Sequence, residues 1–362
     1  MKISPNLSRA FQVANLPAMV LVILIHYNTR AAIADKSAGD ANYFLQQLLA
    51  NGIARVAVPF FALAAGFFFF LNYAGTASYV RNLRKRVRTL FVPYLVVSVI
   101  MTAGFLVARA VVGSSHGVKP LETIAEIVLR PRSAQFWFLR DLMVLTLVSP
   151  VIYLLVRILR EFWVVALGAA WLLELQVLPK ISGVYLVNIE TLFFFTLGCW
   201  LVARAGFLER LVALRASWLA AAAVVWLGLL VARVCVDPTM DLWYVRRFTM
   251  TSLVLYKAAI LAGLVVLVRS AASGLLGKRT LIFLSGYTFF AFLFHYFPLN
   301  LLVVRISALI VPAEYAFYVN APLAAALAFA AAFVCDRYLN PLYRLLTGDR
   351  GPGKVLRRLT SP

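Results

Sequence analysis

Apolar segments of about twenty residues recur along the whole chain, and no other feature limits the possible folds as much. A segment of this length crosses the ~30 Å hydrocarbon core of a bilayer as an α-helix. Of the 362 residues 63% are hydrophobic and only 14% are charged, whereas soluble domains carry about 25% charged residues. The sequence therefore predicts an all-α, polytopic membrane bundle of about ten helices, over residues 10–29, 51–72, 89–112, 136–156, 162–178, 190–204, 215–234, 250–269, 280–304 and 312–335.

The net charge of +21 is unevenly distributed. Most lysines and arginines lie in alternate turns between the apolar segments, as the positive-inside rule requires of cytoplasmic loops. This pattern argues against nucleic-acid binding and predicts that both termini are cytoplasmic. We predict a transmembrane domain over residues 1–340 and a basic tail over 341–362, mobile from about residue 344 and lying against anionic membrane lipids.

The beginning of the chain has a second interpretation. Lys2 and Arg9 precede an apolar stretch, and Ala32-Ile33-Ala34 resembles the cleavage site of a signal peptide. His26 and Arg30 are unusual in such a peptide, so we favour a retained first helix. The three cysteines match no zinc or redox spacing, and we expect neither a metal nor a tightly bound cofactor.

Ionisable residues within the apolar segments are costly to bury in lipid and are therefore candidate functional residues. In the predicted topology they all fall in the outer half of the membrane, which suggests a polar chamber open to the outside. For Arg55, Glu174, Glu190 and Lys257 the alternative is a helix end whose side chain snorkels to the interface, and for His295 it is hydrogen-bonded packing. The full set is His26, Arg55, Arg140, Asp141, Glu174, Glu190, Lys257 and His295.

Arg140 and Asp141 are neighbours in the sequence. Consecutive helical residues point in different directions, so we predict that these two do not pair as residues four apart do. Each would then need another partner, and Asp141 is a candidate to orient a histidine.

A run of cations occupies residues 81–88 on the predicted cytoplasmic side, and it includes Lys85, Arg86 and Arg88. Such a run is a strong topology signal. Arginine also presents paired donors to phosphate, so the same run is a candidate site for an anionic phosphate ligand. The two interpretations are compatible.

Six sequence motifs, in this order and spacing, resemble those of the membrane-bound acyltransferase family 3, whose members O-acetylate exported and cell-surface polysaccharides. The resemblance covers most of the chain. The motifs are Met19–Asn28 with His26, Arg55–Phe68 with Pro59 and Gly66, Lys85–Arg88 with Pro93 and Tyr94, Phe136–Leu142 with Trp137, Phe193–Gly198, and Ser285–His295.

The resemblance implies a transferase in the bacterial inner membrane that takes an acyl group from cytoplasmic acyl-CoA, with acetyl-CoA expected. The acceptor would be a hydroxyl of an extracytoplasmic glycan or glycolipid. His26 would be the general base or a transient acyl carrier, oriented by Asp141 or Glu190, with Arg140 stabilising the oxyanion. We expect Trp137, Glu190 and His295 to contact the acceptor.

Two positions depart from the family pattern. Asn15 stands where the family has an arginine eleven residues before the histidine, about 16 Å along the same helix face. Thr89 stands where the second arginine of the helix-3 pair is expected. We expect Asn15, Lys85, Arg86 and Arg88 to face the donor.

Two other functions remain open on the sequence alone. One is a transporter or flippase for a glycan or lipid-linked intermediate, because intramembrane charges also mark transport paths. The other is a catalytically inactive relative.

Overall fold

The computed structural model describes residues 3–27, 40–111, 127, 133–175, 177–181, 184–236, 249–274, 279–353 and 355. These residues are helical apart from one short antiparallel hairpin, β1 (Lys180–Ile181) and β2 (Val184–Tyr185). The all-α class predicted from the sequence is confirmed.

Six helical stretches are each long and apolar enough to cross a membrane. Three are single helices, and the others include a 3-10 or π-helical segment. They are α1 (Pro5–His26); α2 (Ala41–Gln46) continuing through η2 (Gln47–Gly52) and η3 (Ile53–Val56) into α3 (Ala57–Phe70); α4 (Thr76–Arg86) continuing through η4 (Val87–Phe91) into α5 (Val92–Val111); α12 (Ala216–Val236); α13 (Met250–Ala272); and η6 (Ala313–Tyr315) with α17 (Ala316–Tyr338).

Three further spans are bent pairs of helices. α7 (Trp137–Leu147), which follows η5 (Ala134–Phe136), meets α8 (Ser149–Leu159) at 66°. α10 (Ile189–Val202) meets α11 (Ala205–Val212) at 96°, and α15 (Thr288–Phe294) meets α16 (Leu299–Ala308) at 76°. The remaining helices are α9 (Glu161–Leu172), α14 (Arg279–Ser285) and α18 (Asn340–Thr347).

The described residues therefore contain six to nine candidate spans rather than ten. The additional predicted segment corresponds to α9, which has only 12 residues and is shorter than the ~17 needed to cross the bilayer. The chain is a multi-pass membrane protein, and the cytoplasmic location of its termini stays a prediction.

The cationic run and the C-terminal tail differ from the sequence-based topology. The cationic run at 81–88 was predicted as a turn, but it lies in α4 and η4, which continue directly into α5. Its apolar residues Val80, Leu83 and Val87 repeat at helical spacing among the cations, a pattern of amphipathic helices. The tail was predicted to be mobile from residue 344, but Tyr343, Leu346 and Thr347 of α18 are buried.

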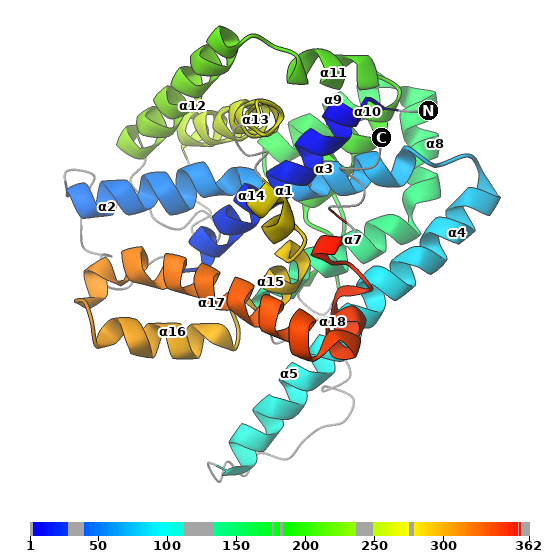
Figure 1. Cartoon of the computed structure of the whole chain (residues 1–362). Coiled ribbons are helices and arrows are strands. Elements are labelled where there is room, and N and C mark those ends of the chain that lie inside the picture. Colours follow the sequence, from blue (N-terminus) through cyan, green and yellow to red (C-terminus); the bar gives the residue numbers. More distant parts are fainter. Residues whose placement is uncertain are drawn as a thin grey trace.

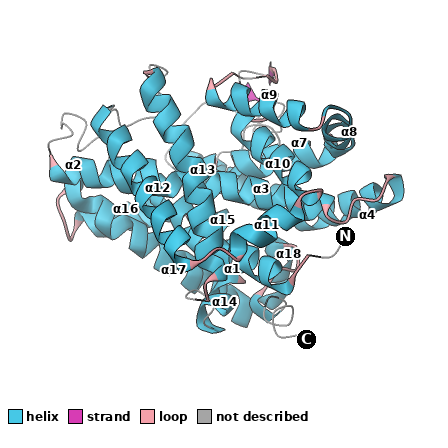
Figure 2. Ribbon diagram, turned by 90° about the horizontal axis from the view of Figure 1, so that it is seen from above, coloured by secondary structure: helices cyan, strands magenta, loops and turns pink. Residues whose placement is uncertain are grey.

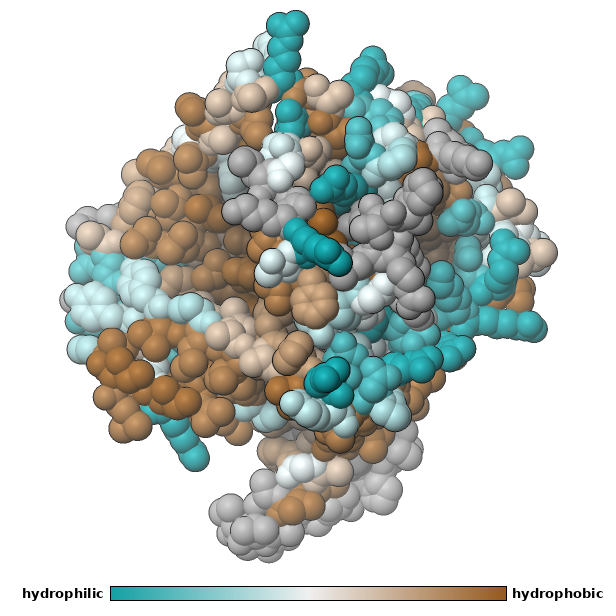
Figure 3. Space-filling view, viewed as in Figure 1, coloured by the Kyte–Doolittle hydropathy of each residue, from teal (hydrophilic) through white to brown (hydrophobic). Residues whose placement is uncertain are grey.

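Different helices form two opposite sides of the molecule, and these sides differ in polarity. α4 and α8 lie at the right in both Figure 1 and Figure 2, whereas α2 and α16 lie at the left. Figure 3 shows apolar residues over much of the visible face and hydrophilic residues gathered at the right, over α4. Large apolar side chains face outward, among them Phe162 at 83% exposed and Leu309 at 88%, as expected of a lipid-facing surface.

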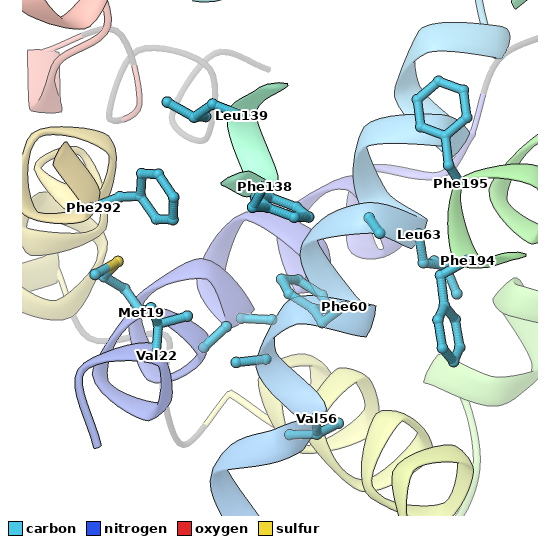
Figure 4. Close-up of a cluster of buried hydrophobic side chains, with 14 of the residues drawn as sticks. Met19, Val22, Val56, Phe60, Leu63, Phe138, Leu139, Phe194, Phe195 and Phe292 are labelled. Atoms are coloured by element: carbon cyan, nitrogen blue, oxygen red, sulfur yellow. The ribbon is translucent and has the colours of Figure 1, made fainter. Parts of the chain in front are cut away.

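The core is built from aromatic and aliphatic residues contributed by α1, α3, α7, α10 and α15 (Figure 4). α3 and α10 approach most closely at two glycines. A Cβ added at Gly66 would lie 2.1 Å from the Phe195 carbonyl oxygen, and one at Gly198 would lie 2.4 Å from that of Leu63. Small residues at such crossings let membrane helices pack backbone to backbone.

Candidate functional site

One predicted site residue, His295, lies at a break in a helical span. α15 ends at Phe294 and α16 begins at Leu299, so residues 295–298 leave the regular hydrogen-bond ladder. Irregular backbone at membrane depth is tolerated only where protein groups or water in a cavity satisfy its polar atoms. The hydrogen bonds around this break therefore indicate which residues build the site.

Side chains from two distant segments satisfy carbonyl groups at the break. Gln135 donates through Nε2 to the carbonyl oxygens of Leu293 at 3.1 Å and Phe297 at 3.3 Å. The Tyr27 hydroxyl, one residue after the end of α1, donates to the carbonyl oxygen of His295 at 2.7 Å. The break is thus fixed against both the end of α1 and the beginning of α7.

The break places His295 beside His26. The two imidazole centroids are 5.0 Å apart, and the ring of Tyr296 lies 4.9 Å from that of His26. His26 is half-buried, whereas His295 is fully buried. The sequence placed both histidines in the outer half of the membrane without predicting that they meet.

The hydrogen bond at Nδ1 determines which nitrogen of His295 can act as an acceptor. Nδ1 lies 2.9 Å from the carbonyl oxygen of Phe292. A carbonyl only accepts, so Nδ1 carries the proton and Nε2 of the neutral ring has a free lone pair. Nε2 is buried and makes no hydrogen bond within the described part of the chain.

Arg140 and Asp141 do pair, so the prediction that they would not is wrong. Arg140 Nη2 lies 3.1 Å from Asp141 Oδ1. Adjacent helical side chains leave the axis in different directions, but the arginine side chain is long enough to turn back along the helix surface. Asp141 is fully buried and accepts a second hydrogen bond from the Asn188 backbone N–H at 2.9 Å, so both of its oxygens are engaged. The role predicted for Asp141 in orienting His26 stays a prediction.

A second polar cluster joins α9, α10 and α13. Glu190 accepts a hydrogen bond from Trp171 Nε1 at 3.1 Å. Lys257 pairs with Glu174, and its ammonium group lies 4.6 Å from the Trp171 ring centroid. Glu174, Glu190 and Lys257 are therefore linked by direct contacts. The snorkelling alternative fits Lys257 poorly, because the whole residue is only 2% exposed.

Arg55 is buried at the end of a polar ladder on η2 and η3. Its Nη2 donates to Asn51 Oδ1 at 2.6 Å, and Asn51 Nδ2 donates to Gln47 Oε1 at 2.9 Å. All three residues are at most 3% exposed. The snorkelling interpretation fits Arg55 poorly as well, because its guanidinium group is held inside the protein.

The residues expected to face the donor lie on α1 and at the junction of α4 and η4. Lys85 and Arg88 are exposed, Arg86 is half-buried, and Asn15 is half-buried within α1. Trp137, expected to contact the acceptor, begins α7 directly after Gln135 and Phe136 and packs edge-to-face on Phe138.

Sequence reasoning missed Gln135 and Tyr27. Both had a weak signal, since Gln135 is a polar residue at the head of an apolar segment and Tyr27 follows the candidate base directly. Neither carries charge, so neither attracted attention as an intramembrane ion does. Their role depends on carbonyl groups that become free only where α15 and α16 separate.

Replacing Gln135 with leucine should destabilise the break. The variant keeps a similar volume but leaves the Leu293 and Phe297 carbonyls without a donor, at a cost of about 1–3 kcal/mol for each unsatisfied group. We expect a lower thermal unfolding temperature and a longer spacing between His26 and His295, with reduced activity. Gln47→Leu is the matched control, because it removes a buried amide that hydrogen-bonds Asn51 rather than the carbonyls of the break. Equal stability losses with unchanged activity in both variants would contradict a positioning role for Gln135.

Comparison with known proteins agrees with this architecture. The model of the Acyltransferase domain family matches residues 17–337, a range that includes His26, Gln135 and His295. The chain is also 28% identical over 340 residues to the succinoglycan biosynthesis protein ExoH of Rhizobium meliloti (strain 1021), covering 88% of this chain and 85% of that protein. No solved structure matches. Because the family model covers nearly the whole chain, including both segments that carry the histidine pair, the protein belongs to this acyltransferase family.

Proposed function

We propose that the protein transfers an acyl group, with acetyl as the expected group, from cytoplasmic acyl-CoA to a hydroxyl of an extracytoplasmic glycan or exopolysaccharide. The observation that carries the proposal is the pair of imidazoles at the break between α15 and α16, 5.0 Å apart and fixed from two other segments. The similarity to a protein named for succinoglycan biosynthesis supports a polysaccharide acceptor. The membrane concerned would be the bacterial inner membrane.

The reaction needs one proton acceptor and no redox step. His26 removes the proton from the acceptor hydroxyl as its oxygen attacks the thioester carbonyl. The tetrahedral intermediate collapses with cleavage of the C–S bond, and the proton passes to the thiolate of CoA. In the alternative route His26 itself takes the acyl group and then passes it to the hydroxyl.

His295 and the Arg140–Asp141 pair would assist in different ways. Nε2 of His295 accepts a hydrogen bond from a sugar hydroxyl and so orients the acceptor beside His26. Arg140 would stabilise the oxyanion of the intermediate, and its pairing with Asp141 fixes the direction of its guanidinium group. No cofactor is needed, because a thioester is already an activated acyl donor.

The cluster around Trp171 suits a sugar. Carboxylate and ammonium groups hydrogen-bond sugar hydroxyls, and an indole ring offers an apolar face. Glu190, Lys257 and Trp171 are held together by the contacts described above. We assign them to the part of the acceptor that extends beyond the reacting hydroxyl, with Trp137 near the reacting end.

Purified protein in lipid nanodiscs, given acyl-labelled acetyl-CoA and an oligosaccharide of the host's exported polysaccharide, tests the function. We expect label on the oligosaccharide and release of free CoA in equal amounts. In proteoliposomes, movement of a fluorescent glycan without label transfer would instead support a transporter or flippase. If the protein still binds acetyl-CoA but neither transfers label nor moves the glycan, it is an inactive relative.

A further inference from the structure

The C-terminal segment packs against the cationic motif of α4 and η4. Tyr343 of α18 is 1% exposed and stacks on Phe290 of α15, with centroids 5.6 Å apart. Its hydroxyl donates to the Gly286 carbonyl oxygen at 3.4 Å. This part of the tail is therefore a fixed element of the fold, and Figure 1 shows α18 beside the junction of α4 and α5.

Two glycine contacts fix the position of the residues that follow α18. Gly348 has a positive φ of 60°, and a Cβ there would lie 2.4 Å from the Cα of Thr89. A Cβ at Gly286 would lie 2.4 Å from the Cα of Pro352. The backbone after α18 therefore occupies the space beside Thr89, the position where the sequence lacks the second arginine of the family pattern.

A cavity of about 360 Å³ lies between α18 with its following turn and the segment formed by η4 and the beginning of α5. Arg88 and Val92 line it from one side, and α18 with its turn lines the other. Arg344 donates through Nε to Asp349 Oδ1 at 2.7 Å, a contact that fixes its guanidinium group while its two terminal nitrogens remain for another ligand. The lining from the C-terminal side is Asn340, Pro341, Arg344, Leu345, Gly348 and Asp349.

A further arginine of the same segment lies close to the motif. The Arg350 guanidinium carbon is 3.9 Å from the Phe289 ring centroid, which fixes its position. Burial, and then the nearby charge of Arg86, lower the pKa of Arg350 to about 9, so it stays charged at neutral pH. The positive charges of Arg86 and Arg350 repel each other, and a bound anion relieves this repulsion. The two arginines therefore favour an anionic ligand.

We propose that α18 and the turn through Arg350 complete a polyphosphate site with the α4–η4 motif. Arg344 and Arg350 supply the cations that Thr89 does not. The ligand class is a phosphorylated molecule, and we assign it to the phosphate groups of the acyl-CoA donor. The inference rests on the proposed function, which supplies that donor.

The position of this site suits a long donor molecule. Phe289, which holds Arg350, lies near the beginning of α15, and His295 directly follows the last residue of this helix. Their separation of six residues corresponds to about 9 Å at 1.5 Å per residue. A CoA whose phosphates bind Arg344 and Arg350 would therefore have to direct its pantetheine arm along α15 to bring its thioester to the histidines. This geometry connects the donor and acceptor sites through one short helix.

Binding of coenzyme A to the purified full chain tests the inference. We compare wild type, Arg344→Gln, Arg344→Gln/Arg350→Gln, and Arg210→Gln, an exposed arginine of α11 outside the cavity. A charge-assisted hydrogen bond contributes enough to change affinity about 10- to 100-fold. We expect Kd to rise by that factor for Arg344→Gln, to rise further for the double variant, and to stay unchanged for Arg210→Gln.

A second variant tests the architecture without removing any charge. Gly348→Ala forces the turn away from Thr89 and should weaken CoA binding at least tenfold, provided the size-exclusion profile remains that of wild type. The Arg344 variants decide the question if Gly348→Ala does not fold.

The outcomes distinguish failure of the proposed function from failure of this site. Wild type that binds no CoA overturns both the proposed acyl-CoA donor and this site. Wild type that binds CoA, with the arginine variants binding equally well, overturns only the site. The same comparison with anionic phosphatidylglycerol vesicles distinguishes the source of the phosphate: variants that lose vesicle binding but keep CoA affinity would assign the cavity to a lipid headgroup and contradict the proposal.

Discussion

Replacing His26 with alanine should lower acyl transfer by about 10²- to 10⁴-fold, the usual contribution of a general base. The imidazole lies at the end of α1, half-buried, with its ring 5.0 Å from His295 and 4.9 Å from Tyr296. The Tyr27 and Gln135 hydrogen bonds hold the carbonyl groups of residues 293, 295 and 297 without the imidazole. The measurement is label transfer from acetyl-CoA by purified protein in nanodiscs.

Two controls separate chemistry from structure in this variant. The size-exclusion profile and CoA affinity of His26→Ala should remain those of wild type, because the Tyr27 and Gln135 hydrogen bonds still hold the break. Added free imidazole should restore part of the activity, since it can enter the space left by the side chain and accept the proton. Full activity of His26→Ala without added imidazole would exclude His26 as base and as acyl carrier.

Alanine at Gly66 or Gly198 should strongly destabilise the fold. The added Cβ would lie 2.1 Å from the Phe195 carbonyl oxygen or 2.4 Å from that of Leu63. Both neighbours are backbone atoms within helices, so they cannot rotate away as a side chain would. Overpacking typically costs 1–3 kcal/mol and occasionally more, and we expect the upper end of that range or failure to fold. Thermal unfolding in detergent measures the effect.

Gly228→Ala is the matched control for the glycine variants. Gly228 lies in α12 and has no neighbouring atom within 4 Å of an added Cβ. Alanine there should stabilise the helix by about 0.5–1 kcal/mol. Equal unfolding temperatures for the Gly66, Gly198 and Gly228 variants would show that α3 and α10 can separate without cost, contrary to the packing described here.

Hydropathy predicted the class of fold because it depends on local sequence. Apolar length alone identified most spans, and the six long helical stretches lie where they were predicted within a few residues at most ends. The basic segment before α5 was not predicted as a helix. A helix that is polar on one face and continuous with a span has the same average composition as a turn, so hydropathy does not distinguish the two. α9 was counted as a span although its 12 helical residues are too few.

The candidate site was predicted in part. Charge and position selected His26 and His295; His295 lies at the break in the span, and His26 lies beside it. The Arg140–Asp141 pair was mispredicted because helix geometry gives the directions of Cβ atoms, not those of a flexible guanidinium group. Gln135 was missed because an uncharged amide gives no electrostatic signal, and its function depends on carbonyls far along the chain.

The sequence by itself determined that this chain lies in a membrane, where most of the long apolar helices lie and which ionisable side chains they carry, since each of these properties depends on residues near one another. Only the tertiary structure decided that α15 and α16 separate at His295, that Gln135 and Tyr27 bind the carbonyls freed there, and that α18 folds back onto the cations of α4 and η4. These features bring together residues more than a hundred positions apart. Helix packing creates such contacts, and no local pattern in the sequence encodes them.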